Sequence, residues 1–280
     1  MAPCPDATGF RTEKAPFPSL KILSYNIHKG FSFANRRFVL KRMREVLEIT
    51  NADLVLLQEV QGAHHGHAQN VEEWPQESQF EYLADRLWPH HAYGKNAVYD
   101  EGHHGNAILS KHSFVSYENI DVSTNPFERR GLLHAVVAPP GFATPLHVIC
   151  THFDLSEFGR RQQVKRLTER IAEAVPPSCP LVIAGDFNDW KERAGRMIER
   201  DLNLVEAYKT LHGRCARSFP SWWPFLRLDR IYIRGLVPVL AECLSGKPWS
   251  ELSDHAALYG EFALPPPDAV TTRSGSSPAP

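Results

Sequence analysis

The chain has 280 residues, of which 42% are hydrophobic, and its formal net charge is −1 at pH 7. This length fits one large domain or two modest ones, and every apolar run is strand-sized, so no membrane-spanning helix is predicted. The near-zero charge disfavours tight non-specific binding to duplex DNA. The five cysteines have no Cys-x-x-Cys spacing, which disfavours a disulfide framework and a structural zinc site.

The two ends of the chain differ in composition from the rest. Segment 1–18 mixes prolines with charged residues and lacks the apolar stretch of a signal peptide, so we expect a loose N-terminal tail on a cytoplasmic protein. Segment 265–280 is rich in Pro, Ser and Thr and is predicted to be a disordered tail. No linker composition divides the remainder, so we predict a single domain over residues 19–264 and a monomeric protein.

Strand and helix patterns alternate in the first third of the chain. Strands are predicted over Leu20–Ile27 and Asp53–Val60, and between them Phe38–Ile49 has the apolar spacing of one helix face. Residues 61–79 are polar and rich in His and Gln, which predicts a long surface loop. A short helix is expected over Phe80–Trp88.

The middle of the chain has consecutive strand patterns separated by turn residues. These strands are expected over His91–Tyr99, Asn106–Ser110, Phe114–Val122, Leu132–Ala138 and Leu146–His152. No helical pattern separates them, which disfavours a doubly wound nucleotide-binding fold.

The last part of the chain begins with a second amphipathic helix, expected over Phe158–Val175. An apolar strand over Leu181–Asp186 and helical material around Trp190–Arg200 follow it. Three more strands are predicted, near Leu228–Arg234, Val237–Leu244 and Ala256–Leu264. Runs of strands with flanking helices predict an α/β fold of two stacked, antiparallel or mixed sheets with the helices outside.

Several of the apolar runs end on polar side chains. The strand Leu181–Asp186 breaks at Gly185, and Asp186 and Asn188 then point to the same side because strand side chains alternate between faces. A buried carboxylate such as Glu59, flanked by leucines and a valine, is costly unless it is paired or bound to a metal. Oxygen ligands suit Mg²⁺ or Mn²⁺ better than zinc. Further polar residues at the ends of apolar runs are Asn26, His152, Asp229, Asp254 and His255.

Six short strings make the chain resemble the endonuclease/exonuclease/phosphatase superfamily of metal-dependent phosphoesterases. In chain order they are Ser24-Tyr25-Asn26, Leu57-Gln58-Glu59, Thr151-His152, Gly185-Asp186-Phe187-Asn188, Leu228-Asp229-Arg230-Ile231 and Ser253-Asp254-His255. Each string is short, but six in the right order make a specific match. The resemblance implies a four-layered α/β sandwich whose active site lies at one edge of the two sheets.

The resemblance also implies a metal site and a water-activating group. Glu59 is the expected principal metal ligand, with Asn26 and Asp254 close by, and the expected ion is Mg²⁺ or Mn²⁺. Asp186 is expected to orient and deprotonate the attacking water. Asn188 is expected to hold that water or the phosphate.

Other residues are candidates for contacts with the phosphate. The resemblance implies that His255 contacts the phosphoryl oxygens, that Asp229 accepts a hydrogen bond from its ring, and that His152 is a further phosphate contact. Substrate contacts are also expected from Asn106, Arg130 and Arg161, for which a turn role or a solvated surface role is the alternative.

Two other groups of residues invite a functional hypothesis. The histidines of segments 64–67 and 103–104 lack a Cys or carboxylate spacing, so plain polar loop residues are favoured over a zinc site. The aromatic segment Phe219–Phe225 suits base stacking, lipid contact or cover for the sheet edge. Cover is favoured because Asp229 nearby must be held rigidly.

The expected function is therefore hydrolysis of a phosphate ester with the help of Mg²⁺ or Mn²⁺. The substrate is a phosphodiester, from a nucleic acid or a phospholipid headgroup, or a phosphomonoester. A non-catalytic phosphate- or nucleic-acid-binding protein on the same scaffold is the first alternative. A zinc hydrolase built on the loop histidines is the second.

Overall fold

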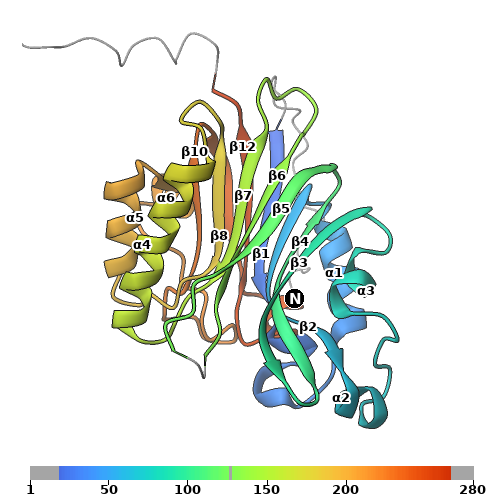
Figure 1. The fold of residues 1–280 in the computed structure, drawn as a ribbon. Helices are drawn as coiled ribbons and strands as arrows, with labels where there is room; N and C mark the ends of the chain where they lie inside the picture. Colours follow the sequence, from blue (N-terminus) through green and yellow to red (C-terminus); the bar gives the residue numbers. More distant parts are fainter. Residues whose placement is uncertain (1–18, 126–127, 266–280) are drawn as a thin grey trace, which may run out of the picture.

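The computed structural model describes residues 19–125 and 128–265, and these form two six-stranded sheets packed face to face (Figure 1). The first sheet has the order β11-β12-β1-β2-β4-β3 and the second the order β5-β6-β7-β8-β10-β9. The first consists of β1 (Ser19–Asn26), β2 (Leu54–His64), β3 (His90–Tyr99), β4 (Gly102–Ser110), β11 (Val237–Leu244) and β12 (Ala257–Ala263). The second consists of β5 (Phe114–Asp121), β6 (Gly131–Val137), β7 (Leu146–His152), β8 (Leu181–Asp186), β9 (Val205–Glu206) and β10 (Asp229–Arg234).

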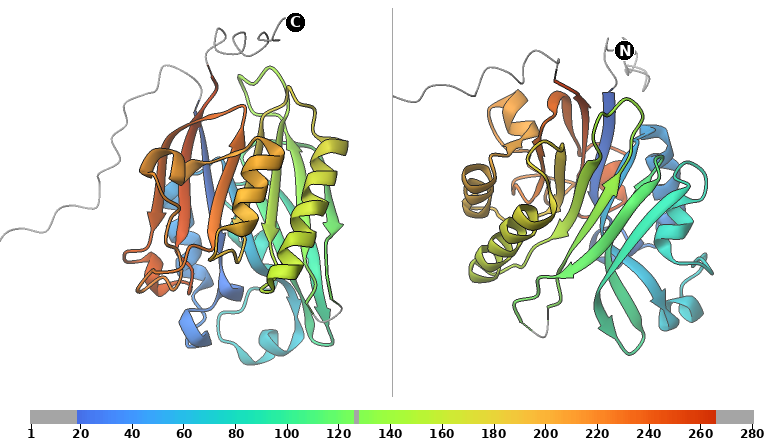
Figure 2. Two further views of the ribbon diagram at one scale, coloured as in Figure 1. Left: turned by 90° about the vertical axis from the view of Figure 1, so that its left-hand side faces the viewer. Right: turned by 45° about the horizontal axis from the view of Figure 1, so that its top comes forward.

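Helices cover the outer faces of the two sheets, as the views in Figure 2 show. Apolar side chains of α1 and α3 pack with those of β1 and β2 on one outer face, and those of α4 and α5 pack with β7 and β8 on the other. A third cluster of buried apolar residues fills the space between the sheets. The helices are α1 (Leu40–Thr50), α2 (His65–Asn70), α3 (Gln79–Ala84), α4 (Glu157–Ala174), α5 (Arg193–Leu202) and α6 (Ala207–His212), with short 3₁₀ turns η1 (His28–Gly30), η2 (Phe33–Asn35) and η3 (Trp249–Glu251).

This arrangement confirms the predicted four-layered α/β sandwich with mixed sheets. Strand β1 pairs in parallel with β2, and β7 pairs in parallel with β8, while the other neighbours are antiparallel. None of the helices in the described part of the chain has the length and apolar content needed to span a bilayer. The predicted tails at 1–18 and 265–280 lie outside the described residues, apart from residue 265.

The predicted loop over residues 61–79 is wrong in its first half. Strand β2 continues to His64, and α2 follows it directly. Gln61 is buried, and its side chain bonds to Tyr99, so a polar residue occupies an interior strand position. The strand β9 and the helix α6 were not predicted, because a two-residue strand and a six-residue helix are too short to show a hydrophobic period.

Candidate active site

The site lies where neighbouring strands of both sheets end. In the second sheet, Asp186 at the end of β8 is the register partner of His152 on β7 and of Asp229 on β10. In the first sheet, Asn26 at the end of β1 stands beside Gln58 on β2. The topology therefore brings polar side chains from distant parts of the sequence to one edge of the sandwich.

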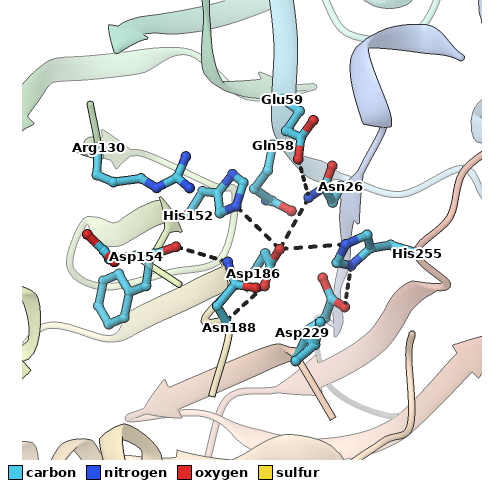
Figure 3. Close-up of polar contacts among 12 residues, drawn as sticks. Asn26, Gln58, Glu59, Arg130, His152, Asp154, Asp186, Asn188, Asp229 and His255 are labelled. Carbon is cyan, nitrogen blue, oxygen red and sulfur yellow. Dashed lines mark hydrogen bonds and ion pairs between the residues drawn. The ribbon is translucent and has the colours of Figure 1, made fainter. Parts of the chain in front are cut away.

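Asp186 is the centre of the polar network drawn in Figure 3. Its Oδ2 lies 3.2 Å from Asn26 Nδ2, 3.4 Å from His152 Nε2 and 3.7 Å from His255 Nε2. Its Oδ1 accepts a hydrogen bond from the backbone N–H of Asn188 at 2.9 Å. Burial and the charge of Asp229 raise the pKa of Asp186 to about 6, against the opposing charge of His255.

His255 and Asp229 form a buried pair beside Asp186. The Nδ1 of His255 lies 3.0 Å from Asp229 Oδ2, and both side chains are almost fully buried. Burial alone would lower the pKa of His255, but the charges of Asp229 and Asp186 outweigh burial and raise this pKa to about 10. The imidazole is therefore a cation at neutral pH, with its Nε2–H directed toward Asp186.

Glu59 belongs to the same network through Asn26. The amide Nδ2 of Asn26 donates to Glu59 Oε1 at 3.2 Å as well as to Asp186. Burial would raise the pKa of Glu59, but the charge of Lys29 and the hydrogen bond from Asn26 bring it below the usual range. Lys29 Nζ lies 3.9 Å from Glu59 Oε2. Glu59 is therefore an ionised carboxylate facing the pocket.

Unusual backbone geometry holds these side chains in place. Glu59 has φ +55° at an irregularity in the pairing of β2 with β4, and Asn188 has φ +48°. Left-handed backbone at residues other than glycine is strained and concentrates at functional sites. Gly185 has φ +150°, and a Cβ there would lie 1.9 Å from the carbonyl oxygen of Thr151. The glycine before Asp186 is thus required by the close approach of β7.

These residues surround a pocket of about 490 Å³. Glu59, Asp186 and His255 line it, together with His152 and Asn188. The amide Nδ2 of Asn188 donates to the carbonyl of Phe153 at 3.0 Å. Burial and the charge of Arg130 lower the pKa of His152 well below its ordinary value, so this ring is neutral.

The pocket also includes residues for which no role was predicted. Lys29, Leu155 and Trp190 line it, and so does His104. The prediction that segments 64–67 and 103–104 are loops is wrong, because His103 and His104 lie within β4 and His64 ends β2. Burial and the charge of Lys29 lower the pKa of His104 to about 4, so His104 adds a neutral imidazole to the wall. Neither the polarity of His104 nor its position in the sequence predicted that a strand would carry it to the pocket.

Of the three predicted substrate contacts, one lines the pocket and two do not. Arg130 lines the pocket and pairs with Glu128. Asn106 is buried, and its Nδ2 donates to the carbonyl of Gly131 at 3.1 Å and to that of Cys150 at 3.4 Å. Arg161 is exposed on α4 and lines a separate hollow between α4 and α5. The structure therefore brings only the first of the three to the site.

The aromatic segment before Asp229 is predicted to cover the sheet edge, but the structure leaves its tip exposed. Trp222, Trp223 and Phe225 are 60%, 70% and 55% exposed. The base of the segment does reach the site, because Phe219 lines the pocket and its ring centroid lies 4.9 Å from that of His255. Rigidity at Asp229 comes instead from Ser218, whose Oγ accepts the Asp229 backbone N–H at 3.2 Å.

The donor atoms at the site fit a hard divalent cation. Carboxylate oxygens of Asp186 and Asp229 lie within 4.8 Å of each other and of a ring nitrogen of His255, and no other such group of His, Cys, Asp and Glu is found among the residues described. The protonated His255 ring has no lone pair to offer a cation, so the available ligands are oxygens. Asp229 Oδ1 and Gln58 Oε1 are buried without a hydrogen-bond partner among the described residues. Such oxygens, like those of the ionised Glu59, are ligands that Mg²⁺ and Mn²⁺ accept.

The predicted metal ligands are arranged around this cluster. Asn26 presents its Nδ2 to Glu59 and Asp186, while its Oδ1 accepts the backbone N–H of His28 at 3.1 Å. Asp254 is partly exposed, and its Oδ1 lies 3.9 Å from the His28 Nδ1. A cation at Glu59 would thus have Asn26 within its immediate surroundings.

Comparisons with known proteins agree with this geometry. The model of the endonuclease/exonuclease/phosphatase family matches residues 23–255. The uncharacterized protein YbhP of Escherichia coli K12 is 46% identical over 246 residues, which cover 88% of this chain and 97% of that protein.

Solved structures with 15–21% identity share the fold. An endonuclease/exonuclease/phosphatase from Beutenbergia cavernae gives a TM-score of 0.69 at 18% identity, over 88% of this chain and 72% of that one. D. rerio TDP2 complexed with a single-strand DNA product gives 0.62 at 21% identity, over 87% and 98%. A mannosyl-6-phosphatase from Bacteroides thetaiotaomicron gives 0.66 at 15% identity, over 88% and 100%. The family match, the close relative and the fold together show that this chain belongs to the endonuclease/exonuclease/phosphatase family.

Proposed function

We propose that this protein hydrolyses a phosphate ester, either a phosphodiester or a phosphomonoester, in a reaction that depends on Mg²⁺ or Mn²⁺. The observation that carries the proposal is the convergence of Asp186, His255 and Glu59 on one pocket from both sheets. Ionisable groups with perturbed pKa values that face one cavity are typical of a functional site. Here Asp186 with a raised pKa, a protonated His255 and an ionised Glu59 face the same cavity.

Each group has a distinct task in such a reaction. Asp186 accepts a proton from the water whose oxygen attacks phosphorus, and a base with a pKa near the working pH suits this step. As the new P–O bond forms, the ester P–O bond breaks, and the departing alkoxide oxygen takes up a proton from solvent water. The His255 imidazolium donates a hydrogen bond to the phosphoryl oxygens, where negative charge increases.

Glu59 would hold the divalent ion, and Asn26, whose Nδ2 donates to Glu59, would orient this carboxylate. A bound cation supplies further stabilisation of the negative charge on the phosphoryl group. Arg130, held against Glu128 at the pocket wall, is a second positive group that a phosphate can contact. One protein with this fold is complexed with a single-strand DNA product and another is a mannosyl-6-phosphatase, and both support a phosphate-ester substrate.

Hydrolysis of bis(p-nitrophenyl) phosphate tests the proposal. We expect turnover with Mg²⁺ or Mn²⁺ and loss of turnover in EDTA. The variant Glu59→Gln keeps the shape of the side chain but removes its charge, so we expect roughly a 100-fold loss of metal affinity or activity. Glu169→Gln, an exposed carboxylate change on α4, is the matched control and leaves turnover unchanged.

A negative result would have to extend beyond one synthetic ester. The panel includes single- and double-stranded DNA, RNA, inositol and sugar phosphates, sphingomyelin and glycerophospholipids, each with both ions. Absence of metal-dependent turnover on every member contradicts the proposal and favours the alternative of a non-catalytic phosphate-binding protein.

A further inference from the structure

Exposed phenylalanine and tryptophan side chains are concentrated at one place on this molecule. Within the described residues, every exposed member of these two types comes from four segments around the candidate active site. They are Phe33, Phe158, Trp190, Trp222, Trp223 and Phe225, with exposed fractions between 41% and 71%. We call these six side chains the aromatic rim.

The aromatic rim is continuous with the pocket. Trp190 lines the pocket directly, and Leu155, which is 57% exposed, lines it just before Phe158 in the chain. Phe219 and Leu226, which flank Trp222 and Trp223 in the chain, also line this pocket. These contacts place apolar groups from separate segments around one opening.

Contacts within the rim hold parts of it in a defined arrangement. The rings of Phe33 and Trp222 meet edge to face, with centroids 6.3 Å apart, so the segments after β1 and before β10 adjoin. The guanidinium of Arg160, which is buried, lies 4.7 Å from the centroid of the Trp190 ring. Despite these contacts, Phe33, Trp190 and Trp222 remain 41–60% exposed.

An exposed set of this size requires an explanation, because large apolar patches on soluble proteins mark interaction surfaces. Residues 218–226 of the aromatic segment contain no charged side chain. Platforms that bind single-stranded nucleic acid combine aromatic residues with a basic groove that follows the phosphates. An uncharged tip with two adjacent tryptophans instead matches side chains that insert at the boundary between headgroups and acyl chains.

Basic residues at the margins of the rim complement an anionic surface. Arg36 and Arg37 follow Phe33, and Lys191 follows Trp190. All three are exposed, and none forms a salt bridge with another residue of the described chain. Cations flanking inserted aromatic groups strengthen attachment to anionic lipids.

We propose that the aromatic rim docks on a phospholipid bilayer and presents the pocket to headgroup phosphates. This inference deepens the proposed function and rests on it for the identity of the substrate as a phospholipid phosphodiester. The docking itself depends only on the rim. Attachment is peripheral: Trp222, Trp223 and Phe225 enter the interface, and the basic residues stay among the headgroups.

Vesicle flotation with the full chain tests the docking step. The probes are vesicles of phosphatidylethanolamine with phosphatidylglycerol, vesicles of phosphatidylcholine, and a single-stranded oligothymidylate. We expect the protein to float with the anionic vesicles and more weakly with the neutral ones. The double variant Trp222→Ser/Trp223→Ser removes two exposed side chains, and we expect its partitioning to fall roughly tenfold or more.

The matched control is Val115→Ser/Tyr117→Ser, which removes two side chains exposed to 64% and 55% on the edge strand β5. This control is expected to float like the natural protein. A blue shift of tryptophan emission on vesicle addition, absent from the Trp222→Ser/Trp223→Ser variant, gives a second readout. Failure to float, or flotation that the aromatic double variant retains, overturns the proposal. Binding of the oligothymidylate through the two tryptophans without vesicle binding also overturns it, in favour of a nucleic-acid platform.

The outcome is separable from that of the hydrolysis assay. Flotation requires no turnover, so Asp186→Asn protein is expected to float as the natural protein does. Flotation without hydrolysis of any ester would retain the docking surface and refute the proposed function. Hydrolysis without flotation would support the proposed function and refute the docking surface.

Discussion

Asp229 contributes to the site without lining the pocket. Its Oδ2 lies 3.0 Å from His255 Nδ1, and its charge is the main influence that keeps this buried ring protonated. The second oxygen, Oδ1, is buried without a hydrogen-bond partner among the described residues. Asp229 is therefore a positioning residue that sets both the charge and the orientation of His255.

Replacing Asp229 with Asn tests this role through the pH dependence of turnover. The variant keeps the size of the side chain but removes its charge, so the pKa of His255 falls from its value of about 10. In the proposed mechanism His255 acts while it is protonated, so the alkaline limb of the pH–rate profile is expected to move toward neutral pH. Turnover is expected to fall about 10- to 100-fold. An unchanged alkaline limb would contradict the pairing.

A buried pair of histidines, whose residues do not line the pocket, joins two strands of the second sheet to helix α4. His134 on β6 and His147 on β7 face each other, with Nε2 and Nδ1 3.0 Å apart. Arg170 on α4 donates from Nε to His134 Nδ1 at 3.1 Å and pairs with Glu118 on β5. Burial and the charge of Arg170 lower the pKa of His134 to about 4.

This contact predicts a loss of stability in acid. The folded-state pKa of His134 lies below the unfolded value of 6.5, so the unfolded chain binds more protons between these two values. Stability therefore falls as the pH drops from 6.5 toward 4. Urea unfolding at about pH 7 and about pH 5 should show that His134→Gln removes about 1–2 kcal/mol of this acid-induced loss. His91→Gln, a change at an exposed histidine of β3, is the control. Equal acid-induced losses of stability in the natural protein and both variants would refute the prediction.

Hydrophobic periodicity predicts the bounds of an element best where that element has a continuous apolar face. Helix α4 and strand β8 were predicted to within one residue at each end. The apolar residues of α4 recur with the helical period of 3.6 residues, and β8 is an unbroken apolar run. The extension of β2 was missed because its buried polar residue is satisfied by hydrogen bonds. The backbone N–H of Gln61 donates to Gln79 Oε1 at 2.9 Å, a contact between residues 18 positions apart that hydropathy does not register.

At the scale of the whole molecule, hydrogen bonds join the two sheets near the site. Asn106 on β4 donates to the carbonyl oxygens of Gly131 and Cys150, which belong to β6 and β7. Gln58 on β2 donates to Cys150 Sγ at 3.3 Å. Asn26, also from the first sheet, bonds to Asp186 in the second. The geometry of the site thus depends on how the sheets are stacked.

Asn106→Ala is expected to weaken this stacking. The change leaves two buried carbonyl oxygens without one of their donors, so we expect the free energy of unfolding to fall by about 1–3 kcal/mol. Urea denaturation measures the change, and Asn70→Ala, at an exposed asparagine of α2, is the control. A loss below about 0.5 kcal/mol would show that the amide does not hold the sheets together.

The four-layered sandwich was expected from the family resemblance that six short strings carry. In the structure three of these strings end β1, β7 and β8, one lies within β2, one begins β10 and one precedes β12. The side-chain directions between sheets were not predictable in the same way. Sequence placed Asn106 and Arg161 among the phosphate contacts, but whether they reach the pocket depends on sheet packing and helix rotation. The same limit applies to the Trp222 segment, whose tip is exposed although Ser218 and Phe219 at its base contact Asp229 and His255.

We propose that Asp186 activates the attacking water at a metal-dependent phosphoesterase site. The most direct test is the turnover number of Asp186→Asn on bis(p-nitrophenyl) phosphate with Mn²⁺, beside Asp201→Asn, a surface change on α5. We expect Asp186→Asn to lose at least about 10³-fold in turnover, with unfolding by urea showing an intact fold, while Asp201→Asn stays near the natural rate. Turnover of Asp186→Asn within about tenfold of the natural protein would contradict the account.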